Sequence, residues 1–274
     1  QPASLIEKPV RPKKVTMAAG TIFLAMLLSI GVPTLIETIK RKTLADETAF
    51  ADRFRLPVSA RVPRVASLRL GRHERERVAD ECGRILQQLR STNTGDRLGS
   101  VGLLSCDENC STSGLASQLA ITAGTKYGLS TLLIDGDRKL RTVSKLFRLN
   151  GAPGFGELAT STDIAINDCV QSSKFDNVML MTPQAKTSRL ARLVHPRDVA
   201  SLLHKFTEEY DLVIIDLPRD EAFSRSFCQM IDNVFIVADL DKTTPESVTE
   251  SLDGLRGSNV RVKGLVLQGN KSGR

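Results

Sequence analysis

A turn between two apolar segments carries residues that come close to a phosphate-binding site. It reads Ser-Cys-Asp-Glu-Asn-Cys-Ser-Thr-Ser over residues 105–113 and leads into the helical sequence GLASQLAITAGTKY. A phosphate-binding loop needs glycines so that backbone N–H groups can surround the anion, a lysine that neutralises it, and a hydroxyl group for Mg²⁺. Of these groups only the hydroxyl is present, at Ser113. The turn therefore has the position of a phosphate-binding loop without most of its chemistry.

Carboxylates follow two later segments that resemble buried strands. The segment TLLIDGD ends in Asp135 and Asp137, and the segment YDLVIID ends in Asp216. In a parallel sheet, ligands bind beyond the carboxyl ends of the strands, where such groups hold Mg²⁺ or an attacking group. Turns favour Asp in any case, so each residue alone is also explained by its turn. Three of them around one loop indicate a site.

Two cysteines in the same turn could in principle bind a metal. Cys106 and Cys110 lie four residues apart, beside two acidic residues. A zinc site needs two more ligands at a suitable spacing. The three histidines, His73, His195 and His204, show no such spacing. We therefore expect unligated thiols and structural or surface histidines.

The elements that must position these residues alternate between strands and helices. Strands that are apolar throughout and separated by helices indicate a parallel sheet covered on both faces. We expect one doubly wound α/β domain over residues 75–274. The expected strands are Ser100–Ser105, Thr131–Asp135, Asn177–Thr182, Asp211–Asp216, Asn233–Asp239 and Val262–Gln268, and the expected helices are Val78–Arg90, Gly114–Tyr127, Arg141–Leu149, Arg197–Glu209 and Pro245–Arg256.

The composition of the 274 residues limits the class of protein. With 41% apolar and 25% charged residues, the chain can bury a core, which excludes disordered, collagen-like and disulfide-scaffold proteins. Aromatic residues make up 4%, too few for a surface that stacks single-stranded bases, so we expect no nucleic-acid partner. The net charge of +7 arises in residues 1–100, with 18 basic and 10 acidic groups, whereas residues 101–274 hold 20 and 21. The five cysteines lack a repeated short spacing, which fits reduced thiols in the cytosol.

An uncharged segment near the start predicts a membrane span. Residues 15–36 read VTMAAGTIFLAMLLSIGVPTLI, and a helix of this length spans about 33 Å, the thickness of a bilayer core. A signal peptide usually has a shorter apolar core, and a buried core helix seldom lacks charges on every face. Basic residues flank the segment almost evenly, so they do not set its orientation. The reduced cysteines favour a cytoplasmic C-terminal side.

This span divides the expected organisation of the chain. Residues 1–14 form an extracytoplasmic segment, residues 15–36 the transmembrane helix and residues 37–74 a basic cytoplasmic linker. Basic residues within 40–77 would attract anionic lipid head groups by about 1 kcal/mol per well-placed charge, although an ordinary solvated linker has the same composition. The chain begins with Gln, so we expect an excised fragment or a processed product.

Several motifs, taken in order, resemble one family. They are similar to the cytoplasmic half of bacterial exopolysaccharide co-polymerases, the chain-length and transport proteins whose cytoplasmic domain is a bacterial tyrosine kinase. The matches are Leu56-Pro57-Val58 and Val62-Pro63 to LxLPVxxxxP, Glu81, Arg84 and Gln87 to ExxRxxR, LLIDGDRKLR to LLIDxDxRxP, YDLVIIDLP to YDxVIIDxPP, His195-Pro196-Arg197 to SPR, and Thr243-Thr244 to a TT pair.

The resemblance implies a P-loop-type doubly wound parallel sheet, preceded by one transmembrane helix, in the bacterial inner membrane. It implies a homo-oligomer, with polysaccharide polymerase and export proteins as partners, and Mg·ATP as the cofactor of a working site. The implied residues are Cys106, Asn109, Ser111, Thr112 and Ser113 for the nucleotide loop, Asp135, Asp137 and Asp216 for catalysis, Ser113, Asp135 and Asp216 for Mg²⁺ when nucleotide binds, and Glu81, Arg84 and Gln87 for the oligomer interface.

The departures from the family pattern predict the function. Thr112 stands where the loop lysine belongs, and Asn109 and Ser111 restrict the left-handed backbone geometry that glycines adopt freely. Asp107 and Glu108 add negative charge, and each unit charge at contact distance from a triphosphate costs about 1–4 kcal/mol. We therefore expect badly weakened ATP binding and no resident cofactor.

A pseudokinase that works by oligomerisation and protein contacts is the expected function. The family carries a tyrosine-rich tail that it phosphorylates, whereas this sequence has tyrosines at 127 and 210. The alternatives are an active ATP-dependent protein-tyrosine kinase and a membrane-bound partitioning-type ATPase. Both alternatives require the lysine that this loop lacks.

Overall fold

The structure is a computed structural model of the chain. It describes 14–41, 53–65, 67–93, 95–107, 110–137, 140–149, 151, 153–159, 163–183, 196–217, 224, 227–256 and 260–269. The chain divides into two compact units, Gln1–Thr43 and Leu44–Arg274, and each is considered by itself.

The first unit contains helix α1 (Lys14–Arg41), which includes the segment that the sequence predicts to cross a membrane. Its large apolar side chains between Ile22 and Val32 are 45–68% exposed. In the part of the chain that the structure describes, no helix combines the length and the apolar character required to span a bilayer.

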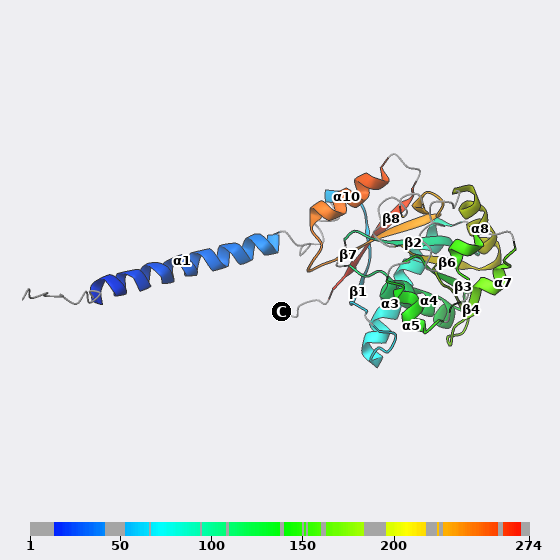
Figure 1. Ribbon diagram of the computed structural model, residues 1–274, viewed down its shortest axis with the longest axis horizontal. Helices are drawn as coiled ribbons and strands as arrows, with labels where there is room; N and C mark the ends of the chain where they lie inside the picture. Colours follow the sequence, from blue (N-terminus) through cyan, green and yellow to red (C-terminus); the bar gives the residue numbers. More distant parts are fainter. Residues whose placement is uncertain are drawn as a thin grey trace, which may run out of the picture. The chain divides into compact units, whose positions relative to one another are not determined.

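The second unit is built on an eight-stranded sheet with the order β1-β8-β7-β2-β6-β3-β5-β4 (Figure 1). Neighbouring strands run parallel except for β4, which pairs with β5 in the antiparallel direction. The expected α/β fold with a parallel sheet is therefore confirmed. The strands are β1 (Val58–Val62), β2 (Gly99–Ser105), β3 (Thr131–Asp135), β4 (Val170–Ser172), β5 (Val178–Met181), β6 (Leu212–Leu217), β7 (Asn233–Asp239) and β8 (Val262–Gln268).

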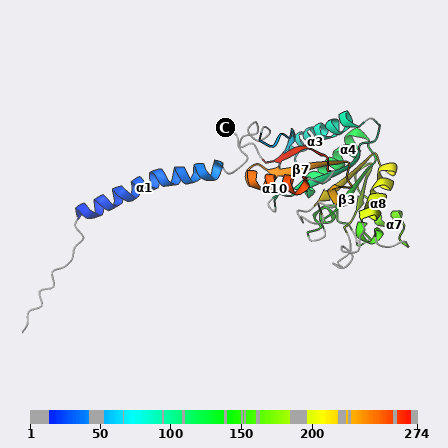
Figure 2. The same ribbon diagram turned by 90° about the horizontal axis from the view of Figure 1, so that it is seen from above.

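Helices cover both faces of this sheet, as Figure 2 shows. Because successive side chains of a strand point to opposite faces, Ile214 packs in one core and Ile215 in the other. The core that contains Ile214 is shared with α3 and α4, and the core that contains Ile215 is shared with α6, α8 and α10. The helices of the unit are α3 (Arg72–Thr92), α4 (Ser113–Tyr127), α5 (Thr142–Phe147), α6 (Phe155–Leu158), α7 (Ile166–Cys169), α8 (Pro196–Glu209) and α10 (Pro245–Leu255).

The sheet extends beyond the strands that the sequence predicts. Strand β1 lies in the segment expected to be a linker, and it pairs with β8. The backbone N–H of Leu265 donates to the carbonyl oxygen of Pro57 at 2.9 Å, just before this strand begins. Strand β4 and the short helices α6 and α7 were also not predicted. Helix α3 is longer than the expected Val78–Arg90, because it begins at Arg72.

Helix α4 owes its position to glycines at both ends. A Cβ atom at Gly114 would lie 1.9 Å from the carbonyl oxygen of Val65, so this first turn can approach the neighbouring backbone only with glycine. At the other end, Gly128 adopts a left-handed φ of 67° and its N–H bonds to the carbonyl oxygen of Gly124. These contacts place the start of α4 directly after the turn that follows β2.

Candidate functional site

The turn between β2 and α4 lies at the carboxyl end of the central strands, as predicted. Cys110, Ser111, Thr112 and Ser113 are described, whereas Asn109 falls outside the described residues. The Ser105 hydroxyl bonds to the carbonyl oxygens of the residues at 107 and 110, the latter at 2.8 Å. The turn is therefore closed by a side chain of the strand that precedes it.

Thr112, which the family resemblance aligns with the loop lysine, contacts one of the predicted carboxylates. Its Oγ1 donates a hydrogen bond to Oδ1 of Asp216, and the two residues are 5% and 1% exposed. Burial raises the pKa of Asp216 to about 7, and the hydroxyl groups of Ser113 and Thr112 offset part of this effect. Within the described residues, Oδ2 of Asp216 has no hydrogen-bond partner. The side chain of Thr112 is thus a neutral group that is already bonded within the chain.

Asp135 lies beside Asp216, because β3 and β6 pair with these two residues in register. Its Oδ2 accepts hydrogen bonds from the Ser144 backbone N–H at 2.9 Å and from the Ser144 hydroxyl at 2.8 Å. Burial raises the pKa of Asp135, while these bonds and the N–H of Asp137 act in the opposite direction. The structure therefore brings together the three carboxylates that the sequence singled out, and the charges of Asp135 and Asp137 help to raise the pKa of Asp216.

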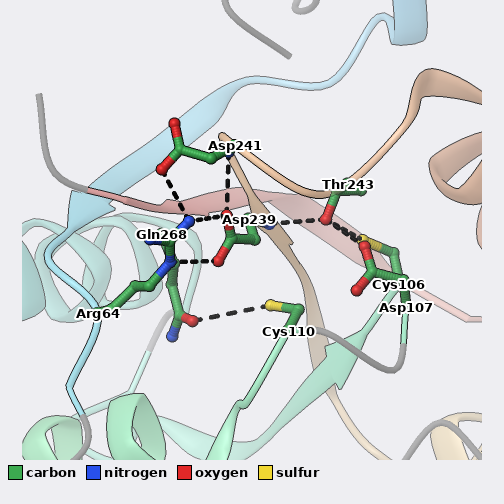
Figure 3. A network of polar contacts seen from close by, with 8 residues as sticks. All are labelled: Arg64, Cys106, Asp107, Cys110, Asp239, Asp241, Thr243 and Gln268. Atoms are coloured by element: carbon green, nitrogen blue, oxygen red, sulfur yellow. Dashed lines mark hydrogen bonds and ion pairs between the residues drawn. The ribbon is translucent and has the colours of Figure 1, made fainter. Parts of the chain in front are cut away.

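Asp107, at the start of the turn, lies beside Thr243 and Cys106 (Figure 3). Its carboxylate accepts a hydrogen bond from the Thr243 hydroxyl, and the side chain of Asp107 is buried. Cys106 lies next to this pair, where its thiol donates to the carbonyl oxygen of Val237 at 3.0 Å. The sequence indicated the charge of Asp107 but not its partner, because Thr243 lies 136 residues away.

The residues around the turn offer oxygen ligands for the Mg²⁺ of Mg·ATP, but the turn itself has no positive charge for the triphosphate. Carboxylate and hydroxyl oxygens are the ligands that Mg²⁺ prefers, and the side chain of Asp216 interacts with that of Ser113 at the start of α4. The sequence has no lysine between residues 103 and 123 that could neutralise a triphosphate, and the carboxylate of Asp107 is buried against Thr243. The turn therefore offers hydroxyl and carboxylate oxygens but no lysine for a triphosphate.

The remaining candidate residues divide into several groups. All five cysteines are described, are buried and form no disulfide bond, and burial raises the pKa of the Cys82 thiol to about 12. Among the described side chains, no group of three or more His, Cys, Asp or Glu residues could hold a metal ion. His204 is exposed and forms an i,i+4 pair with Glu208, whereas His195 falls outside the described residues.

The three residues matched to the oligomer motif lie on α3 in different environments. Glu81 accepts a hydrogen bond from the backbone N–H of Arg61 at 2.9 Å, so its carboxylate binds the edge strand β1. Arg84 forms an ion pair with Glu81 at 3.5 Å and is 67% exposed, and Gln87 is exposed as well. Two of the three residues are therefore accessible on the surface.

Comparisons with known proteins support the resemblance. No protein-family profile matches the chain. A putative tyrosine-protein kinase in the cps region of Klebsiella pneumoniae is 23% identical over 96% of this chain and 39% of its own length. The tyrosine-protein kinase ptk of Acinetobacter johnsonii is 23% identical over 95% and 37%. The chain thus spans about two fifths of the length of these curated relatives.

Solved structures show the same fold. The kinase domain of Escherichia coli tyrosine kinase ETK superposes with a TM-score of 0.73 at 19% identity, covering 84% of this chain and 96% of that domain. The chimerical protein CapA2B2 gives 0.72 at 19% identity, with 81% and 98% covered. The septum site-determining protein MinD of Pyrococcus horikoshii, solved with Mg-ADP, gives 0.53 at 17% identity, with 62% and 69% covered. The resemblance to the bacterial exopolysaccharide tyrosine kinases is confirmed, and the α/β unit has the kinase-like fold of that family.

Proposed function

We propose that the chain is a membrane-anchored component of exopolysaccharide biosynthesis or export whose kinase-like domain is a pseudokinase. The hydrogen bond from Thr112 to Asp216 supports this proposal, because the residue that the resemblance aligns with the loop lysine is neutral and already bonded within the chain. A relative that its name places in a cps region supports the connection to polysaccharide. The domain would act through oligomerisation and through contacts with polymerase and export proteins.

The membrane anchor is the predicted span over residues 15–36, crossing the bacterial inner membrane once with the α/β domain in the cytoplasm. The exposed apolar side chains of α1 support it. The basic residues within 40–77 would add attraction to anionic lipids. Flotation of the full chain with liposomes tests this part of the proposal. We expect the full chain to float and the chain without residues 1–42 to stay in the aqueous phase, whereas an aqueous full chain would contradict the anchor.

The oligomer contact is proposed on the exposed surface of α3, at Arg84 and Gln87. Glu81 would contribute by fixing Arg84, with which it forms an ion pair. Substituting Arg84→Glu should lower the oligomer mass measured by light scattering in detergent. Arg72→Glu on the same helix is the matched control, because Arg72 is exposed and lies outside the motif.

An active kinase remains the rival function, because Ser113, Asp135, Asp137 and Asp216 are in place at the edge of the sheet. In that case Ser113, Asp135 and Asp216 would hold the Mg²⁺ that neutralises the transferred phosphate. The purified chain is incubated with Mg·ATP and a tyrosine-containing copolymer, and phosphotyrosine is detected on a blot. The proposal expects no signal, and a signal that Asp216→Asn removes would establish the active kinase.

A repaired loop provides the positive control for a calorimetric assay of ATP binding. The repair replaces Asn109 and Ser111 by Gly, Thr112 by Lys, Asp107 by Asn and Glu108 by Gln. We expect the repaired chain to gain ATP binding, because the carboxylates that organise Mg²⁺ are still present. If the repaired and unmodified loops bind ATP equally well, the identity of these five residues does not control binding and the reasoning fails.

A further inference from the structure

Residues 63–65 form a short connector after β1, and this connector is linked to the turn between β2 and α4. Arg64 follows Pro63 and forms a two-point ion pair with Asp239 at the end of β7 (Figure 3). The same guanidinium bonds Asp241 at 2.8 Å. The side chain of Asp239 is 2% exposed and that of Arg64 is 42% exposed. A nearly buried carboxylate thus has Arg64 as its ion-pair partner, and the charge of Lys242 adds to the attraction.

Asp239 is joined to the turn through Thr243. The backbone N–H of Asp239 donates to Oγ1 of Thr243 at 2.8 Å, and the N–H of Thr243 donates to the carbonyl oxygen of Asp239 at 2.9 Å. The Thr243 hydroxyl in turn donates to the carboxylate of Asp107. A continuous set of polar contacts therefore runs from Arg64 to the first part of the turn.

The residue after Arg64 touches the other end of the turn. The carbonyl oxygen of Val65 lies so close to Gly114 that a Cβ atom there would be 1.9 Å away. Val65 is itself buried. Val65 thus contacts the first turn of α4, whereas the preceding residue, Arg64, is linked to Asp107 through Asp239 and Thr243.

We propose that Arg64 is a positioning residue that fixes the described parts of the turn, 105–107 and 110–113, through Asp239, Thr243 and Asp107. The inference rests on the proposed function. In a pseudokinase, contacts within the protein would hold the turn in place, as bound nucleotide does in a competent loop. The connector lies between the edge strand β1 and helix α3 in sequence, and a partner that displaces it would release the turn.

Thiol labelling measures this effect directly. Cys110 is a buried residue of the turn, and Cys82 is a buried residue of α3 that serves as an internal reference. The full chain in detergent is treated with iodoacetamide without nucleotide, and the modification rate of each cysteine is followed by peptide mass spectrometry. We expect Arg64→Gln to label Cys110 about tenfold faster, the size expected when charge-assisted bonds that oppose local opening are lost. The rate at Cys82 should stay the same.

Further variants separate positioning from general destabilisation. Arg64→Lys should restore most of the protection, and Arg72→Gln, which removes an exposed ion pair with Glu76, should leave Cys110 unchanged. Thr243→Val should expose Cys110 with Arg64 intact, and it replaces Arg64→Gln as the test if that variant does not fold. An unchanged Cys110 rate, or an equal rise at Cys82, would overturn the inference. ATP binding by the wild-type chain would refute the pseudokinase. The labelling rates would still test the role of Arg64, because they are measured without nucleotide.

Discussion

Substituting Asp216→Asn should stabilise the protein at high pH. The carboxylate is buried, its pKa is raised from 3.8 to about 7, and Oδ2 has no partner within the described residues. Folding therefore disfavours the charged form of Asp216. The stability of the native state is largest while the group is protonated, and it falls as the pH rises toward the raised pKa. Asparagine keeps an oxygen that can accept the Thr112 hydrogen bond without carrying the charge.

The size of the effect follows from the two pKa values. A rise from 3.8 to about 7 amounts to about 4 kcal/mol of destabilisation once the group is fully ionised. Part of this cost is already present at pH 5, so the advantage of Asp216→Asn should grow by about 2–3 kcal/mol between pH 5 and pH 8. Urea denaturation of the full chain in detergent, followed by far-UV circular dichroism, measures it, since the chain has no tryptophan. An advantage that is the same at both pH values, or that shrinks, would refute the reasoning.

Two other substitutions test the local geometry of the site. Gly114→Ala should lower stability by more than about 3 kcal/mol, because its Cβ would meet the carbonyl oxygen of Val65, whereas Gly71→Ala, with open space around it, should change little in the same thermal melt. Ser144→Ala should cost about 1 kcal/mol at pH 7 and raise the pKa of Asp135 further, because the carboxylate loses its hydroxyl donor; a carboxyl resonance of Asp135 that titrates as in the wild type would contradict this.

The core strands could be predicted because each is apolar over its whole length. Strand β1 could not, because VSARV contains an arginine and lies in a basic stretch, and its place in the sheet depends on pairing with β8 some 200 residues later in the sequence. Strand β4 contains three residues, too few to show a period. Local pattern therefore predicts buried parallel strands well and edge strands poorly.

The candidate site, like the sheet, could be predicted only in part from the sequence. The carboxylates of Asp135 and Asp216 could be placed together from the rule that parallel strands end at one edge, and the structure pairs them in register. The bond from Thr112 to Asp216 joins residues 104 apart, and the ion pair of Arg64 with Asp239 joins residues 175 apart. Nothing in the spacing of either pair signals the contact, so the network that holds the turn becomes visible only in the folded chain.

Calorimetric titration of Mg·ATP into the purified wild-type chain tests the central claim most directly. The missing loop lysine removes a charge-assisted contact worth about 1.5–3 kcal/mol, a loss of roughly tenfold to over a hundredfold in affinity. The buried Asp107 carboxylate acts in the same direction. The account predicts no binding heat at nucleotide concentrations up to about 1 mM. Micromolar binding by the unmodified chain would contradict it.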